Sequence, residues 1–269
     1  MKLPLIFAFL FIVSLFAPGQ VLVIAHRGAS AVKPENSLSA FEEAIKSGAD
    51  YIETDVHLTS DGVPVLMHDL SVNRTCVIPE HLNKNGKVYI KDLSYAEFCK
   101  LKIKNSNESP PTLDSAIKLI NGRCKLLIEF KKGSDYYPGI EHKVNAIINS
   151  NNAFGYVDII HSFSKKPLLE MQQKKTGAKL HKLIIFRFPL SSFTFSGKVE
   201  KDDFEAWQGV NSYYRFTGRR LIKRLHAEGK TVYAWTVNRK KHMKKLINKG
   251  VDGIITNNPA LLKEILAKK

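Results

Sequence analysis

Short apolar runs rich in β-branched residues recur along the chain, and the first of them ends directly at polar side chains. That run covers residues 21–25 and is followed by His26, and a second covers residues 51–55. Runs of this kind are typical of buried parallel strands with polar groups at their carboxyl ends. The same pattern predicts further strands at residues 126–130, 157–161, 183–186, 209–212, 231–235 and 253–256. The chain therefore has eight predicted barrel strands.

A helical pattern lies between the first two strands. Asn36 or Ser37 can cap a helix over residues 38–47. Phe41 lies on its apolar face, and Gly48 follows its end. Strand, helix and strand make a βαβ unit. A chain of 269 residues fits a (β/α)8 TIM barrel, which typically needs about 250, and its 44% hydrophobic content suffices for one large core.

Residues 64–67 also have the pattern of a strand, but only the turn-like residues 59–62 separate them from the strand before. Such a connection is too short for a parallel crossover. We therefore expect a hairpin arm that carries His68 over the barrel mouth. Residues 70–110 predict a long irregular insertion that covers the active face and shapes substrate choice. The predicted fold class is an α/β TIM barrel with a hairpin and a small insertion at the mouth.

The first nineteen residues differ from the rest of the chain. Lys2 precedes an apolar run over residues 5–16, and small residues follow, with Ala17 or Gly19 as the cleavage position. This order is typical of a secretory signal peptide. The run is shorter than the roughly 20 apolar residues of a membrane-spanning helix. We expect export to the periplasm or medium, with an uncleaved membrane anchor as the alternative, and residues 20–269 then form the barrel.

The charge of the chain is strongly positive, at +16. Arg219, Arg220, Lys223 and Arg224 lie on one predicted helix, and residues 240–245 lie on another. Such clusters attract polyanions, anionic membranes or phosphorylated substrates, although a solvated helix surface explains any single lysine. An anionic membrane surface is thus a candidate partner. No recognised nucleic-acid motif accompanies the charge, so no nucleic-acid partner is expected.

The cysteines Cys76, Cys99 and Cys124 are too few for a disulfide scaffold and lack the spacing of a zinc site. Two of these cysteines can form one disulfide after export, with the third as a free thiol. Cys124 directly precedes a predicted core strand and is expected to be a small buried hydrophobe.

Charged groups at the strand ends suggest metal-assisted phosphodiester chemistry. Glu53 and Asp55 are two residues apart on a strand, so they project from one face and can share a divalent ion. A salt bridge to Lys131 or Arg27 is the alternative for these carboxylates. Glu129, at the end of the third strand, adds a third carboxylate on the same side as Lys131.

Two histidines, His26 and His68, can share acid and base duties. The other histidines are interpreted as structural. His161 is the least certain of these, because it comes directly before Ser162 and Phe163 at a strand end. Trp235 ends an apolar strand and can form a wall against the substrate. Phe163 can form such a wall as well.

The motifs follow one another in a set order. They include His26-Arg27-Gly28, Pro34-Glu35-Asn36, Glu53-Thr54-Asp55, His68-Asp69, Asn73-Arg74-Thr75, Ile128-Glu129-Phe130-Lys131, Ser162-Phe163, Ala234-Trp235-Thr236-Val237-Asn238 and Gly250-Val251-Asp252-Gly253-Ile254-Ile255-Thr256-Asn257. The ordered set resembles the glycerophosphodiester phosphodiesterase family, within the phospholipase C-like phosphodiesterase superfamily, over residues 21–260. Cys76 and Asn257 depart from the usual family pattern, and neither is expected to touch the chemistry.

The resemblance implies a metal site and a substrate site. Glu53, Asp55 and Glu129 would bind one divalent cation, Mg²⁺ or Ca²⁺, and oxygen-only ligation suits these ions. Arg27 and Lys131 would neutralise the phosphate oxygens of a small-molecule glycerophosphodiester.

The resemblance also implies hydrolysis to glycerol 3-phosphate and an alcohol, with His26 and His68 as the proton-transfer pair. The expected route has two displacements. The glycerol 2-hydroxyl first attacks phosphorus to give a cyclic phosphate, and water then opens it with the histidine roles reversed. The sequence leaves open which histidine starts as the base.

Two other functions remain as alternatives. A lysophospholipase D or a sphingomyelinase D-like enzyme would use the same site on a lipid headgroup. An apolar groove formed by Phe186, Phe188, Phe193 and Phe195 would favour that function. The second alternative is a non-catalytic secreted protein that binds anions at the barrel mouth.

Overall fold

The computed structural model describes residues 20–83, 86–174, 176–185 and 206–268. The predicted signal peptide lies outside these residues. Among the helices of the described residues, none is long and apolar enough to cross a bilayer.

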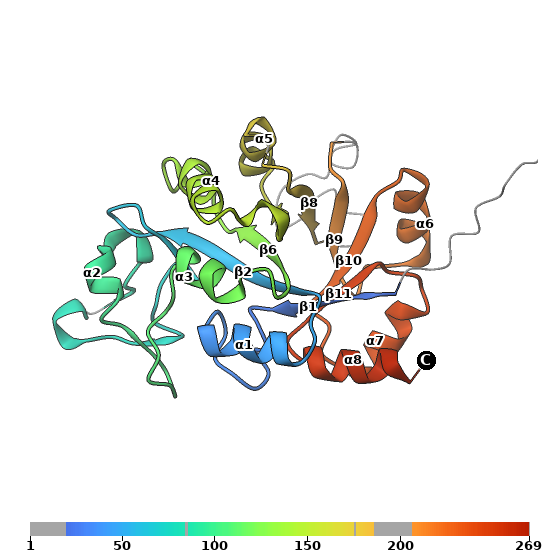
Figure 1. Ribbon diagram of the computed structural model, residues 1–269, viewed down its shortest axis with the longest axis horizontal. Helices are drawn as coiled ribbons and strands as arrows, with labels where there is room; N and C mark the ends of the chain where they lie inside the picture. The colour runs from blue at the N-terminus through green and yellow to red at the C-terminus, as the bar shows by residue number, and fades with distance from the viewer. Residues whose placement is uncertain (1–19, 84–85, 175, 186–205, 269) are drawn as a thin grey trace, which may run out of the picture.

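Eight parallel strands form a closed barrel in the described part of the chain, with helices around it (Figure 1). They are β1 (Leu22–His26), β2 (Tyr51–Leu58), β6 (Lys125–Phe130), β7 (Val157–Ser162), β8 (Lys179–Ile184), β9 (Gly209–Tyr213), β10 (Thr231–Trp235) and β11 (Gly253–Thr256). The first strand, β1, pairs in parallel with both β2 and β11, which closes the barrel. The predicted TIM barrel is confirmed.

One strand prediction is wrong in its position. The structure places β8 at Lys179–Ile184, not at residues 183–186. The first half of β8 is polar in sequence, yet His181 is buried and its Nδ1 lies 3.0 Å from Asn211 Oδ1. Because this partner comes from the next strand, an apolar pattern could not mark the start of β8.

The helices pack against the outside of the barrel. They are α1 (Leu38–Lys46), α3 (Leu113–Ile120), α4 (Ile140–Ser150), α5 (Lys165–Gln173), α6 (Arg219–Ala227), α7 (Lys240–Ile247) and α8 (Pro259–Ala267), with a short 3₁₀ turn, η3 (Ala153–Gly155), after α4. Of the two predicted caps of α1, Ser37 is the one used, because its side chain accepts a hydrogen bond from the Ala40 amide. Phe41 is fully buried, as expected, and Gly48 follows the helix with a φ of +71°.

An apolar layer inside the barrel lies directly beneath the polar strand ends. Its buried members are Ile24, Tyr51, Leu127, Ile159, Tyr233 and Ile255. Two positions after each of the first five, the same strand carries a polar or aromatic residue, in the order His26, Glu53, Glu129, His161 and Trp235. Residues two positions apart on a strand point the same way, so both side chains of each pair project into the barrel. The strands that build the core therefore also present the residues of the barrel mouth.

The hairpin arm forms as predicted. β3 (Pro64–Leu66) pairs antiparallel with β2, and His68 follows it. The insertion is more regular than the sequence suggested. It contains β4 (Cys76–Val77), η1 (Glu80–Leu82), η2 (Ile90–Asp92), α2 (Tyr95–Phe98) and β5 (Lys102–Ile103), and it projects to the left of the barrel in Figure 1.

The insertion has a small apolar core of its own. That core includes Val65, Val72, Cys76, Ile90, Phe98 and Leu101. All three cysteines are free thiols in the described structure, and Cys124 is buried, as expected of a small hydrophobe.

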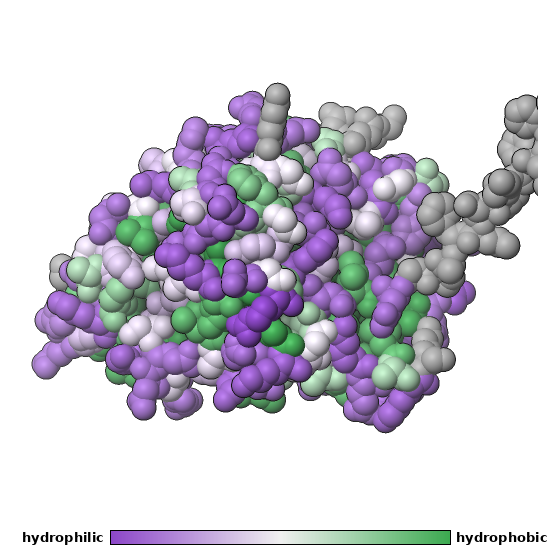
Figure 2. All heavy atoms as spheres, in the orientation of Figure 1, coloured by the Kyte–Doolittle hydropathy of each residue, from purple (hydrophilic) through white to green (hydrophobic). Residues whose placement is uncertain are grey.

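Basic side chains occupy the solvent side of α6 and α7. Arg219, Arg220 and Lys223 are exposed, as are Lys241 and Lys244. Hydrophilic side chains cover most of the face seen in Figure 2, where apolar ones form small separate groups. The solvated-helix interpretation of these residues thus agrees with their exposure.

Gly28 is a position where the fold requires glycine. Its φ is +79°, and a Cβ there would lie 2.6 Å from the backbone carbon of Ala40. We expect Gly28→Ala to lower the free energy of unfolding by about 2–4 kcal/mol, because a left-handed conformation and a backbone clash add together. Urea denaturation of the variant measures this change.

Gly139→Ala is the matched control, because Gly139 has a φ of +76° but open space around it. It should cost only about 1 kcal/mol, the strain of the left-handed conformation alone. Equal losses of unfolding free energy in both variants would show that the clash of the added Cβ with the Ala40 backbone has no effect on stability.

Candidate active site

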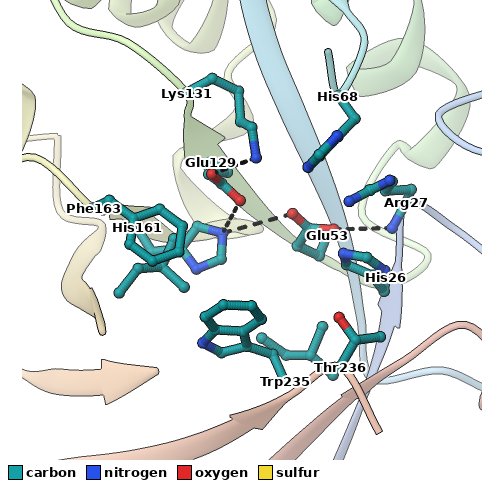
Figure 3. A pocket seen from close by; sticks show the side chains of 12 residues that line it. His26, Arg27, Glu53, His68, Glu129, Lys131, His161, Phe163, Trp235 and Thr236 are labelled. Atoms are coloured by element: carbon teal, nitrogen blue, oxygen red, sulfur yellow. Dashed lines mark hydrogen bonds and ion pairs between the residues drawn. The ribbon is translucent and has the colours of Figure 1, made fainter. Parts of the chain in front are cut away.

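A pocket opens at the carboxyl ends of the barrel strands (Figure 3). Its lining consists of His26, Arg27, Glu53, His68, Glu129, Lys131, His161, Phe163, Leu183, Trp235, Thr236 and Ile255. All the predicted site residues except Asp55 are among these. Residues 70–110, as far as the structure describes them, contribute none, so their influence on substrate choice stays a prediction.

Strand register brings the charged residues together. Glu53 on β2 is paired with His26 on β1, and Asp55 is paired with Glu129 on β6. Glu129 is in turn paired with His161 on β7. Two successive inward-facing rows of strand positions therefore hold these polar groups, with His26 and Glu53 in one and Asp55, Glu129 and His161 in the next.

The carboxylates of Glu53 and Glu129 are buried, and burial raises the pKa of each. Glu53 Oε2 accepts a hydrogen bond from the Arg27 backbone amide at 2.9 Å. Arg27 has a φ of 55°, a left-handed conformation that turns this amide toward the carboxylate. Lys131 Nζ lies 2.7 Å from Glu129 Oε1. Glu53 Oε1, in contrast, is buried without a hydrogen-bond partner.

Asp55 lies behind the pocket lining and is fully buried. Arg27 Nε and Lys131 Nζ each lie 3.3 Å from its carboxylate, and Asn36 Nδ2 donates to Oδ2 at 2.8 Å. Burial opposes its ionisation, but Lys131 and Arg27 outweigh burial and hold the pKa of Asp55 well below its usual range. The ion pairs considered as an alternative are thus formed, and metal ligation by Asp55 stays a prediction.

The two proposed catalytic histidines have different partners. His26 Nδ1 lies 2.6 Å from Asn257 Oδ1, and His68 Nδ1 lies 2.7 Å from Asp69 Oδ1. Both partners are oxygen acceptors, so each Nδ1 carries a proton. Burial lowers the pKa of His26. The expectation that Asn257 lies apart from the chemistry is therefore wrong, because the barrel closes β11 against β1 and brings Asn257 to His26.

His161 belongs to the pocket, although it was interpreted as structural. Its Nε2 lies 3.7 Å from Glu53 Oε1 and 3.9 Å from Glu129 Oε2. Burial lowers its pKa to about 4, so the ring is neutral at pH 7. The signal available in the sequence was its place at a strand end directly before Ser162. Leu183, Thr236 and Ile255 were also missed, and nothing in their residue types marks them.

Two aromatic rings form one wall of the pocket. Phe163 and Trp235 meet edge to face, with ring centroids 5.6 Å apart. Trp235 Nε1 donates to the backbone carbonyl of Asn211 at 2.9 Å, which fixes the indole. Both line the pocket, and their place beside the substrate stays a prediction. The four phenylalanines of the proposed lipid groove lie outside the described residues.

Three comparisons place the chain among known proteins. Residues 26–261 match the glycerophosphoryl diester phosphodiesterase family. A glycerophosphodiester phosphodiesterase from Caldanaerobacter subterraneus subsp. tengcongensis is 35% identical over 257 residues, covering 93% of this chain and 99% of the relative. One from Bacillus subtilis is 28% identical over 271 residues, covering 94% and 88%.

Solved structures show the same fold. A protein from Silicibacter pomeroyi has a TM-score of 0.83 and 23% identity, and the match covers 94% of this chain and 95% of that one. An Oleispira antarctica phosphodiesterase, solved in complex with the product sn-glycerol-3-phosphate, has a TM-score of 0.75 and 24% identity, covering 91% and 96%. The ordered motifs, the barrel and these matches agree, and the chain belongs to the glycerophosphodiester phosphodiesterase family.

Proposed function

We propose that this chain hydrolyses glycerophosphodiesters to glycerol 3-phosphate and an alcohol, with His26 and His68 transferring the protons. The observation that carries the proposal is the meeting of both histidines with buried carboxylates and with Arg27 and Lys131 around one pocket. Family membership supports the reaction. The product bound to the Oleispira antarctica phosphodiesterase supports the product class.

The residues of the site fit a divalent cation. Three carboxylates, those of Glu53, Asp55 and Glu129, outnumber the two cationic side chains that face them. Arg27 also pairs with Glu35 at 3.1 Å, so negative charge is left without compensation in a buried site. Such a charge is costly unless a further cation is present. We propose that these carboxylates hold one Mg²⁺ or Ca²⁺ ion, since both prefer oxygen ligands. When bound, the ion supplies Lewis-acid polarisation of a phosphate oxygen.

Arg27 and Lys131 are suited to bind the phosphate of the substrate. Both line the pocket, and both are only partly exposed, so their charges are weakly screened. A phosphodiester carries one negative charge, which these two cations and the proposed ion attract.

The residues that contact Nδ1 of His26 and of His68 indicate which histidine acts first as the base and which as the acid. Asn257 is neutral and holds His26 with a free lone pair on Nε2, so His26 takes the proton of the glycerol 2-hydroxyl. Asp69 accepts a hydrogen bond from His68 Nδ1 and orients the ring, and His68 gives the proton on Nε2 to the departing alcohol. The cyclic phosphate is then opened by water, with His68 as base and His26 as acid.

The first experiment measures release of glycerol 3-phosphate from glycerophosphocholine with Mg²⁺, with Ca²⁺ and with a chelator. We expect turnover that the chelator abolishes. His26→Ala and His68→Ala should each lower kcat by about 10²–10⁴-fold, because each removes one proton-transfer group.

His142→Ala is the control for these variants, because His142 is exposed and lies on α4 away from the pocket. Release that persists in both active-site variants would refute the histidine assignment. Absence of release with every ion would refute the small-diester proposal. Lysolipid and sphingolipid substrates would then be assayed before a non-catalytic role is considered.

The pH profile tests the division of roles between the histidines. Because burial lowers the pKa of His26 below 6.5, and the base must be neutral, the acid limb of kcat/KM should lie below pH 6.5. Asn257→Asp places a carboxylate beside His26, favours its charged form and should move this limb up by about one pH unit.

Asp69→Asn is the reciprocal variant. It removes the carboxylate that holds His68 Nδ1 but keeps an oxygen acceptor there, and should lower kcat because His68 is oriented less firmly. If Asn257→Asp moves the alkaline limb instead, the two histidines have the opposite roles.

We also propose that the chain is exported and meets an anionic membrane surface. The apolar N-terminal run supports export, and the exposed basic residues of α6 and α7 support the surface. Cell fractionation and mass determination of the mature N-terminus should find cleavage after Ala17 or Gly19. Co-sedimentation with phosphatidylglycerol vesicles should weaken at high salt. An intact N-terminus or salt-independent binding would contradict these proposals.

A further inference from the structure

We propose that His161 is a nitrogen ligand of the active-site cation, and that it gives the site an affinity for imidazole-accepting ions such as Zn²⁺ and Co²⁺ that the carboxylates alone would not provide. The inference rests on the proposed function, because it adds a ligand to the cation proposed there. His161 differs in charge from the other proposed ligands. Its ligand atom is a neutral ring nitrogen that lies among carboxylate oxygens.

The distances around His161 suit a shared ion better than direct contact. Glu53, Glu129 and His161 each offer one ligand atom, and these atoms all lie within 4.8 Å of one another. The separations of 3.7 Å and 3.9 Å from Nε2 to the two carboxylates exceed a hydrogen bond. Ligand atoms that each lie 2.0–2.5 Å from one ion are themselves about 3–4 Å apart.

His161 Nε2 has no hydrogen-bond partner, although the side chain is only 2% exposed. Glu53 Oε1 is likewise buried without a hydrogen-bond partner. Figure 3 shows the imidazole edge directed at both carboxylates, with its two dashed lines meeting at one nitrogen. Leaving a buried polar atom unsatisfied costs free energy, and a bound ion satisfies both atoms at once.

The opposite side of the ring is held by a buried chain of hydrogen bonds. His161 Nδ1 lies 2.8 Å from Asn211 Nδ2, and Asn211 Oδ1 lies 3.0 Å from His181 Nδ1. His181 Nε2 lies 3.3 Å from Thr231 Oγ1. A metal-binding histidine usually has its second nitrogen fixed in this way, which sets the direction of the first. The chain thus supplies the supporting shell of a ligand.

The amide of Asn211 determines which nitrogen of His161 carries the proton. With Nδ2 facing the ring, Nδ1 accepts and the proton is on Nε2. A half-turn of the amide places Oδ1 there, so Nδ1–H donates and the Nε2 lone pair is available to the ion. His181 and Thr231 accommodate both arrangements, because imidazole has one donor and one acceptor nitrogen and a hydroxyl can donate or accept. We expect this half-turn to accompany ion binding.

The chemistry of the donor set predicts the selectivity. Mg²⁺ and Ca²⁺ prefer oxygen, whereas Zn²⁺ and other late first-row ions accept imidazole readily. His161→Gln keeps a polar side chain of similar reach but replaces nitrogen with oxygen. It should lower Zn²⁺ affinity by roughly 10–100-fold and leave Mg²⁺ affinity within about threefold. Titration calorimetry with each ion alone measures both changes.

A second readout detects the nitrogen directly. The full-length protein is loaded with Mn²⁺, and electron spin echo modulation is recorded for the wild type, for His161→Gln and for His142→Gln. His142 is an exposed histidine outside the pocket, so it is the matched control. A ¹⁴N modulation should be present in the wild type and the control and absent from His161→Gln.

The outcomes separate this inference from the proposed function. Ion binding by the wild type without ¹⁴N modulation would overturn the role of His161 and leave the carboxylate site standing. Unchanged Zn²⁺ affinity in His161→Gln would do the same. Absence of any ion binding by the wild type would overturn the cation proposal itself, and His161 ligation with it. Because the overturning spectroscopic result needs only the wild type, poor folding of a variant cannot obscure it.

Discussion

The site depends above all on the burial of three carboxylates within one closed barrel. Glu53, Asp55 and Glu129 are each less than a tenth exposed, and like charges at such short range repel strongly in a low-dielectric interior. Arg27 and Lys131 offset part of that repulsion through the ion pairs that the structure shows. The proposed binding of a divalent cation, and then of a phosphodiester, rests on the negative charge that remains. In that proposal, the same charges stabilise the buried site and attract the substrate.

The two-residue period of a strand connects this charged layer to the core. Every strand that offers a polar group at the mouth has an apolar side chain two positions earlier, inside the barrel. Ile24 and His26 illustrate the relation on β1, and Leu127 and Glu129 illustrate it on β6. The apolar layer excludes water from below, which strengthens the electrostatic interactions above it. Gly28 adds a local requirement, because it lets the chain turn closely past α1 immediately after His26 and Arg27.

The histidines show how neighbours give one residue type several roles. His26 is held by an amide and His68 by a carboxylate, and the proposed mechanism makes His26 the first base and His68 the first acid on this difference. His161 differs from both, because a buried amide holds its far nitrogen and carboxylates face its near one. All three line one pocket, yet they come from β1, from the hairpin after β3 and from β7. The chemistry of each ring follows from what the fold places at its two nitrogens.

The sequence by itself determined the barrel, the hairpin arm and eight of the pocket residues, because hydrophobic periodicity and ordered motifs are local signals. Glu53 and Asp55 could be placed on one face from their spacing alone, and α1 from its cap and its terminal glycine. Only the tertiary structure decided the contact of Asn257 with His26, the membership of His161 in the site and the polar start of β8. Each of these depends on a partner from another strand. Closure of the sheet and its register set such contacts, and no local pattern of residues records them.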